Sequence, residues 1–104
     1  MSTITLLLIA CSSPSSKAQY ACYGSCDVQS MDCPSIDLVQ CYGLCDWVIE
    51  STKDTDGCLE AHTQVWGCDA TIEWTCNPNT NVIAQPVDDA CLDQHNNIPV
   101  ECIP

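Results

Sequence analysis

The sequence lacks phenylalanine and has only two basic residues, Lys17 and Lys53, among its 104 residues. Without phenylalanine and with few other large apolar side chains, a domain of this size cannot rely mainly on a hydrophobic core. Fourteen acidic residues leave a net charge of −12. Because such a surface repels phosphate backbones and anionic lipid headgroups, we expect no nucleic-acid partner and no direct binding to acidic membranes.

Cysteine is the abundant residue instead, with eleven copies. Usage above a tenth of the chain is typical of disulfide-rich domains, which persist only in oxidising compartments. We therefore expect an exported protein with one small domain that disulfides hold together.

The N-terminus fits a targeting segment. Residues 4–10 form an apolar run too short to span a bilayer, and a serine-rich stretch follows. Two cleavage readings remain open. In one, residues 8–11 form a bacterial lipobox, residues 1–10 are removed, lipidated Cys11 is the first mature residue, and residues 11–19 are a polar tether. In the other, ordinary signal peptidase cuts after Ala18. Without Cys11, ten cysteines remain, an even number that can pair completely.

One six-residue phrase occurs twice, as CYGSCD at 22–27 and as CYGLCD at 41–46. A C-x3-C pair places two sulfurs one helical turn apart on one face. We predict two antiparallel helices, the first ended by Pro34 and the second capped by Ser35. Two disulfides would then cross-link them at two levels, Cys22 with Cys45 and Cys26 with Cys41. A zinc site is the competing interpretation, but structural zinc motifs favour C-x-x-C loops, so we predict no metal.

The rest of the chain predicts two more helices, which makes residues 20–104 one all-α domain. An apolar line at helical spacing extends from Ala61 to Cys76, after a cap at Asp56 or Gly57, and a short helix begins at Pro86. We expect the remaining cysteines to pair as Cys33 with Cys58, Cys68 with Cys102 and Cys76 with Cys91.

Gly24 and Gly43 occupy the same place in the two phrases, although a glycine inside a helix costs about 1 kcal/mol relative to alanine. One interpretation is that a third element packs closely on the hairpin there. The alternative is that disulfide-locked helices tolerate glycine.

No motif for catalysis or metal binding is complete. Residues 54–57, Asp-Thr-Asp-Gly, suggest a calcium loop, but an EF-hand register would put Thr52 and Thr63 at its two key ligand positions, so a capped turn is favoured. His62 and His95 have no catalytic motif around them. We therefore predict that the protein is not an enzyme and binds no cofactor.

The tryptophans are the best candidates for a binding site. On the predicted third helix, Trp74 lies about 200° from Ile72 and Cys76, away from the apolar stripe, and Trp66 lies at its margin. Exposed aromatic residues are typical interface anchors, so Trp66 and Trp74 are the predicted anchors. Alternatively, these two and Trp47 complete a thin core.

The spacing of the cysteines resembles the cysteine-rich helical lipoproteins of myxobacteria and related bacteria. The resemblance covers residues 8–102 and rests on Cys22-x3-Cys26, Cys33, Cys41-x3-Cys45, Cys58-Leu59-Glu60-Ala61, Cys68, Cys76 and Cys91. Since the function of such proteins is mostly unknown, the resemblance implies a fold and a location rather than an activity. A weaker resemblance is to ciliate mating pheromones, which are also small, acidic, helical and disulfide-rich.

Together these features predict a non-catalytic interaction module for an unknown protein partner. It would be a lipoprotein of the outer membrane or cell surface, touching the membrane only through its lipid, or alternatively a secreted protein. The alternative function is a diffusible signalling ligand, like a pheromone or a toxin. A calcium-binding surface protein is a minor alternative.

Overall fold

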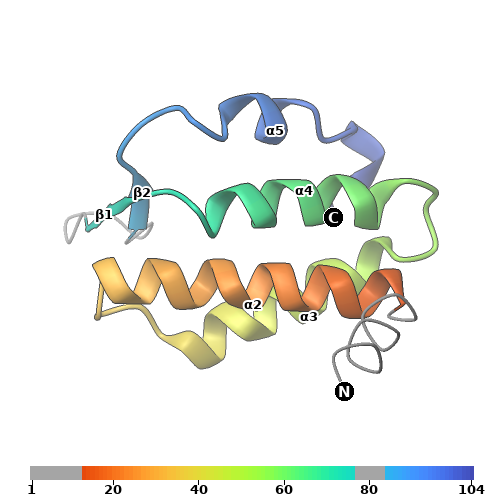
Figure 1. The fold of residues 1–104 in the computed structure, drawn as a ribbon. Helices are drawn as coiled ribbons and strands as arrows, with labels where there is room; N and C mark the ends of the chain where they lie inside the picture. The colour runs from red at the N-terminus through yellow and green to blue at the C-terminus, as the bar shows by residue number, and fades with distance from the viewer. Residues whose placement is uncertain (1–12, 77–83) are drawn as a thin grey trace, which may run out of the picture.

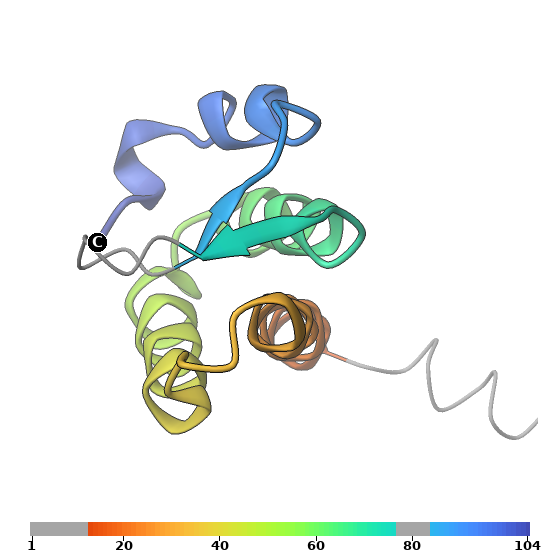
Figure 2. The same ribbon diagram turned by 90° about the vertical axis from the view of Figure 1, so that its left-hand side faces the viewer.

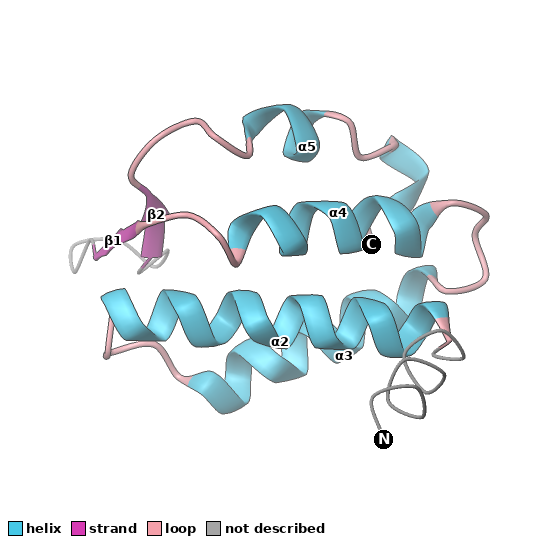
Figure 3. Ribbon diagram, in the orientation of Figure 1, coloured by secondary structure: helices cyan, strands magenta, loops and turns pink. Residues whose placement is uncertain are grey.

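The computed structural model describes residues 13–76 and 84–104, which form a small, mostly helical, disulfide-rich domain as predicted (Figures 1 and 3). Within these residues, no helix has the length and apolar character needed to cross a membrane. A short two-stranded sheet was not predicted. The elements are α2 (Pro14–Asp32), α3 (Leu38–Thr52), α4 (Cys58–Asp69), β1 (Trp74–Cys76), β2 (Ala84–Pro86), α5 (Leu92–Asn96) and the 3-10 helix η1 (Val100–Cys102).

Helix α2 is the centre of the domain, because it packs extensively against both α3 and α4 while α3 and α4 touch only slightly. Figure 1 shows α4 running alongside α2, with α5 on the opposite side of α4. The turned view of Figure 2 shows the same order, with α3 beside α2. Among the described residues, the C-terminal segment with α5 therefore lies over α4 and not over the α2–α3 hairpin.

Helix α2 begins earlier than predicted. The Ser13 hydroxyl accepts a hydrogen bond from the Ser16 backbone N–H at 3.1 Å, and Pro14 occupies the first helical turn. One turn later, Ala18 is fully buried against Ile49 of α3 and Leu59 of α4. The predicted tether over residues 11–19 is therefore wrong from Pro14 onward, because a capped helix starts there. Cys11 and the predicted signal segment lie outside the described residues.

The predicted hairpin is confirmed. Disulfides join Cys22 to Cys45 and Cys26 to Cys41, with Cα separations of 5.8 and 6.0 Å. The predicted cap at Ser35 is wrong, because the Asp37 carboxylate accepts the hydrogen bond from the Gln40 N–H and α3 begins at Leu38.

The other three predicted disulfides are wrong. The third helix ends at Asp69 instead of Cys76, and Pro86 ends β2 instead of starting a helix. Strand β1 pairs antiparallel with β2 and lies next to α2. Because the chain follows this path, different cysteines lie within bonding distance of each other. The observed pairs are Cys33 with Cys76, Cys58 with Cys102 and Cys68 with Cys91.

The described part of the core includes two small clusters, one of Ala18, Ile49 and Leu59 and one of half-cystines in the hairpin. Trp66 packs against both clusters. The largest fully buried side chains are all cysteines: Cys26, Cys33, Cys58 and Cys102. The prediction that disulfides replace a conventional apolar core is therefore confirmed.

Candidate functional site

The repeated phrase places two tyrosines and two aspartates across the hairpin. The Tyr23 hydroxyl donates to the Asp46 carboxylate, whose oxygens lie 2.9 and 2.8 Å away. In the same way, the Tyr42 hydroxyl donates to Asp27. The two tyrosine rings stack with centroids 4.3 Å apart. We call Tyr23, Asp27, Tyr42 and Asp46 the tyrosine–aspartate face.

This face follows from the same geometry that sets the cysteine pairs. When the two phrases, which differ only at their fourth position, lie antiparallel, the first position of one phrase pairs with the fifth of the other, as Cys22 does with Cys45. The second and sixth positions are one helical turn apart on the same flank of each helix, beside the cysteines. Tyr23 of one phrase therefore lies near Asp46 of the other. The sequence contained this signal, but our prediction applied it only to the cysteines. The phrase occurs twice because its two copies complement each other.

The surroundings of the tyrosine–aspartate face are open. Gln19 donates through Nε2 to Asp46 Oδ1 at 3.0 Å, while Tyr20 is 84% exposed. A Cβ added at Gly24 or Gly43 would meet no described atom within 4 Å beyond its own stretch of helix. The predicted packing of a third element on these glycines is therefore wrong, and the alternative of tolerated helical glycines agrees with the structure.

Hydrogen bonding changes the acidity of both tyrosines. The bond to Asp46 raises the pKa of Tyr23, and burial and the nearby negative charge act in the same direction. Tyr42 has a raised pKa for the same reasons, with its bond to Asp27 as the largest cause. Each carboxylate favours the protonated phenol. A phenolate could no longer donate the hydrogen bond, and its negative charge would repel the carboxylate.

We expect Tyr23 and Tyr42 to ionise above the ordinary tyrosine pKa of about 10. Because the pKa of each tyrosine is higher in the folded state, its hydrogen bond to aspartate stabilises the fold fully below pH ~10. This contribution is lost as pH rises through the folded pKa. Asp46→Asn should lower the pKa of Tyr23, which ultraviolet absorbance of tyrosinate measures during a pH titration. Asp93→Asn on α5 removes the same charge elsewhere and is the control. An equal effect of the two variants would contradict a specific Tyr23–Asp46 bond.

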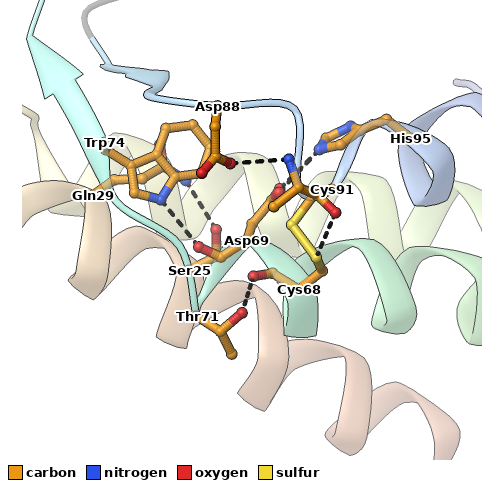
Figure 4. Close-up of polar contacts among 10 residues, drawn as sticks. Ser25, Gln29, Cys68, Asp69, Thr71, Trp74, Asp88, Cys91 and His95 are labelled. Atoms are coloured by element: carbon orange, nitrogen blue, oxygen red, sulfur yellow. Dashed lines mark hydrogen bonds and ion pairs between the residues drawn. A yellow bond between two sulfur atoms is a disulfide. The ribbon is translucent and has the colours of Figure 1, made fainter.

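The structure agrees with the predicted position of Trp66 at the margin of the apolar stripe, but it does not place Trp74 as predicted. Trp66 is half-buried in the core and stacks on His62, with ring centroids 5.1 Å apart. Trp74 is half-buried on β1, and its indole N–H donates to the Asp69 carbonyl at 3.0 Å (Figure 4). The exposed helical position predicted for Trp74 is therefore wrong. Its role as a binding anchor stays an untested prediction that has lost its geometric basis.

The exposed tryptophan is Trp47 on α3, with 55% of its surface accessible. Leu44, three residues earlier on the same helix, is 57% exposed. At 100° per residue, Trp47 lies about 140° from the centre of the stripe that includes Cys41 and Cys45. Helical periodicity could therefore have identified it.

A second polar cluster fastens the C-terminal segment to α4. Asp69 is only 5% exposed, and His95 Nε2 lies 3.0 and 3.1 Å from its carboxylate oxygens (Figure 4). Burial raises the pKa of Asp69, and the hydrogen bond and charge of His95 oppose that rise. The Cys68–Cys91 disulfide lies beside this pair. The cluster therefore cross-links α4 to α5 and to Cys91, which directly precedes α5.

His62 has a similar role at the other end of α4. Its side chain is buried, and Nε2 lies 2.8 Å from the Cys102 carbonyl oxygen. Neither histidine has a motif around it in the sequence. Each nevertheless forms a contact between α4 and the C-terminal segment, and these contacts hold that segment in place. Sequence reasoning missed these contacts because they join residues 40 and 26 positions apart.

The geometry gives the metal alternatives no support. Asp54 and Asp56 are exposed in the turn before α4, where Gly57 takes a φ of 81° at the N-cap. Among residues 13–76 and 84–104, the metal-binding side chains that gather within 4.8 Å are Cys22, Cys26 and Cys45. Their sulfurs already form disulfides.

The chain matches no protein-family model, no curated protein and no solved structure. The resemblances to bacterial cysteine-rich lipoproteins and to ciliate pheromones therefore stay predictions.

Proposed function

We propose that the chain is an exported, non-catalytic protein-interaction module held at a cell surface. The observation that carries the proposal is a rigid hairpin with large apolar side chains on its outside. Tyr20 and Val39 are 84% and 82% exposed, and Leu44 and Trp47 are more than half exposed. Isolated exposed apolar residues are common, but several large ones on two cross-linked helices offer contact residues for a partner.

Rigidity makes this hairpin suited to binding. Two disulfides one turn apart, together with the tyrosine–aspartate face, prevent α2 and α3 from moving relative to each other. Binding of a partner would then cost little conformational entropy, because the hairpin surface is already ordered. Trp47 replaces Trp66 and Trp74 as the proposed anchor, because it combines a large aromatic side chain with exposure.

The proposal of export rests on the disulfides. All ten cysteines in the described part of the chain are paired, which an oxidising compartment permits. Attachment to the surface rests on lipidation of Cys11, and the diffusible signalling ligand is the alternative. The intact mass of the mature protein from its host distinguishes the two, since the anchored form carries lipid.

Trp47→Ala should leave the fold intact, because the side chain is 55% exposed. It should weaken capture of a partner from host envelope extract by roughly tenfold or more if Trp47 is a hot spot. Val87→Ala is a matched control, since Val87 is also apolar and 55% exposed but lies beyond β2. Equal capture by wild type and Trp47→Ala would remove Trp47 from the contact surface.

A further inference from the structure

A groove of about 720 Å³ lies over the outer side of α2 and extends to the end of α4. Small residues line it: Ala21 and Gly24 from α2, Gly67 from α4, and Ala70 directly after α4. A Cβ at either glycine would meet no atom within 4 Å, so the missing side chains deepen the groove. Its size suits a short peptide or a similar ligand.

The walls of the groove combine aromatic rings with negative charge. Tyr20 and Tyr23 line it, and Asp27 is the charged residue among its lining residues. A second hollow of about 280 Å³ shares Ser16 and Gln19 with it. Asp46 and Glu50 line that second hollow, so two further carboxylates lie next to the groove.

Neither lysine of the chain neutralises Asp27. Lys53 forms a salt bridge to Glu50 at 2.9 Å, and Lys17 lines a separate hollow together with Glu60. The net charge of −12 adds a field that attracts cations over the whole surface. The same charge argues against a second copy of this chain as the occupant, because two such surfaces repel each other.

We propose that this groove binds a basic segment of the partner protein. A lysine or arginine of that segment would lay its apolar stem over Gly24 and Tyr20 and direct its cationic head to Asp27. Aromatic faces attract cations, and the stems of these side chains cover apolar surface. This inference rests on the proposed function and specifies the chemistry of the partner.

The test uses the oxidised full chain and a labelled peptide of about 12 residues built from Lys-Leu-Ala-Lys repeats. Gly24→Leu fills the floor of the groove without changing charge, and we expect it to weaken binding by about tenfold or more in fluorescence anisotropy at physiological ionic strength. Asp27→Asn should weaken binding by roughly twofold to fivefold. Gly43→Leu is the matched control, since Gly43 has the same place in the other phrase but does not line the groove.

Thermal unfolding checks the folds of both leucine variants. Neither should be less stable than wild type, because each position is open and leucine is the better helix former. The inference is overturned if Gly24→Leu and Gly43→Leu bind the peptide equally, even where both bind tightly, since general charge attraction would then explain the affinity. It is also overturned if a peptide with glutamate in place of lysine binds as well.

Capture of the natural partner separates this inference from the proposed function. A partner whose capture needs Trp47 but is unaffected by Gly24→Leu would uphold the interaction module and overturn the groove as its binding site. Capture of nothing by any form of the chain would overturn the proposed function. The peptide comparison would still decide whether the groove recognises basic segments.

Discussion

Replacing Cys58 and Cys102 together by alanine should lower the free energy of unfolding by about 4 kcal/mol. This disulfide has the largest sequence separation of the five, 44 residues, so its loss frees the most chain entropy in the unfolded state. Both half-cystines are buried, at 0% and 1% exposure, and alanine avoids placing an unpartnered hydroxyl there. Guanidinium denaturation without reductant measures the change.

The Cys26→Ala, Cys41→Ala double variant is the comparison. Its disulfide spans only 15 residues, for which the same entropy argument predicts about 3 kcal/mol. The Cys22–Cys45 disulfide, one turn away, still closes the hairpin, so the actual loss should be smaller. An equal or greater loss in this variant would contradict the view that the two hairpin disulfides are partly redundant.

Ala18→Asp should destabilise the domain by about 3 kcal/mol or more. The new carboxylate would replace a methyl group with 0% exposure between Ile49 and Leu59, with no cation nearby in the core cluster. Unfolding monitored by circular dichroism measures the loss. Tyr20→Asp, two residues later on the exposed side of α2, is the control and should change stability little.

This comparison also tests where the folded domain begins. In a flexible tether over residues 11–19, an aspartate at position 18 would cost nothing. A large loss from Ala18→Asp with little change from Tyr20→Asp would therefore require α2 to be formed and buried at Ala18, as the structure has it.

The hairpin could be predicted from the sequence because its determinants are local. Helical periodicity aligns Cys22 with Cys26 and Cys41 with Cys45, and a short turn around Pro34 makes the two helices antiparallel. The tyrosine–aspartate face and the exposure of Trp47 follow from the same periodicity. These features were within reach although our prediction did not state them.

Helix ends were less predictable, because cap signals compete over a few residues. Ser13 and Pro14 form an ordinary helix start, but the serine-rich stretch around them also fits a flexible tether. Asp37 and Ser35 are both good caps, and only the turn that follows Cys33 selects Asp37. The burial of Ala18 against two other helices settles the first case.

By itself, the sequence determined a disulfide-rich helical domain and the cross-linked hairpin, since these depend on composition and on spacing within about one helical hairpin. Tertiary structure alone decided the pairs Cys33–Cys76, Cys58–Cys102 and Cys68–Cys91, and it also set the Asp69–His95 contact and the groove over α2. Each of these joins elements that are distant in the chain. Their meeting depends on where α4 ends and on how the C-terminal segment returns across it, which no local pattern encodes.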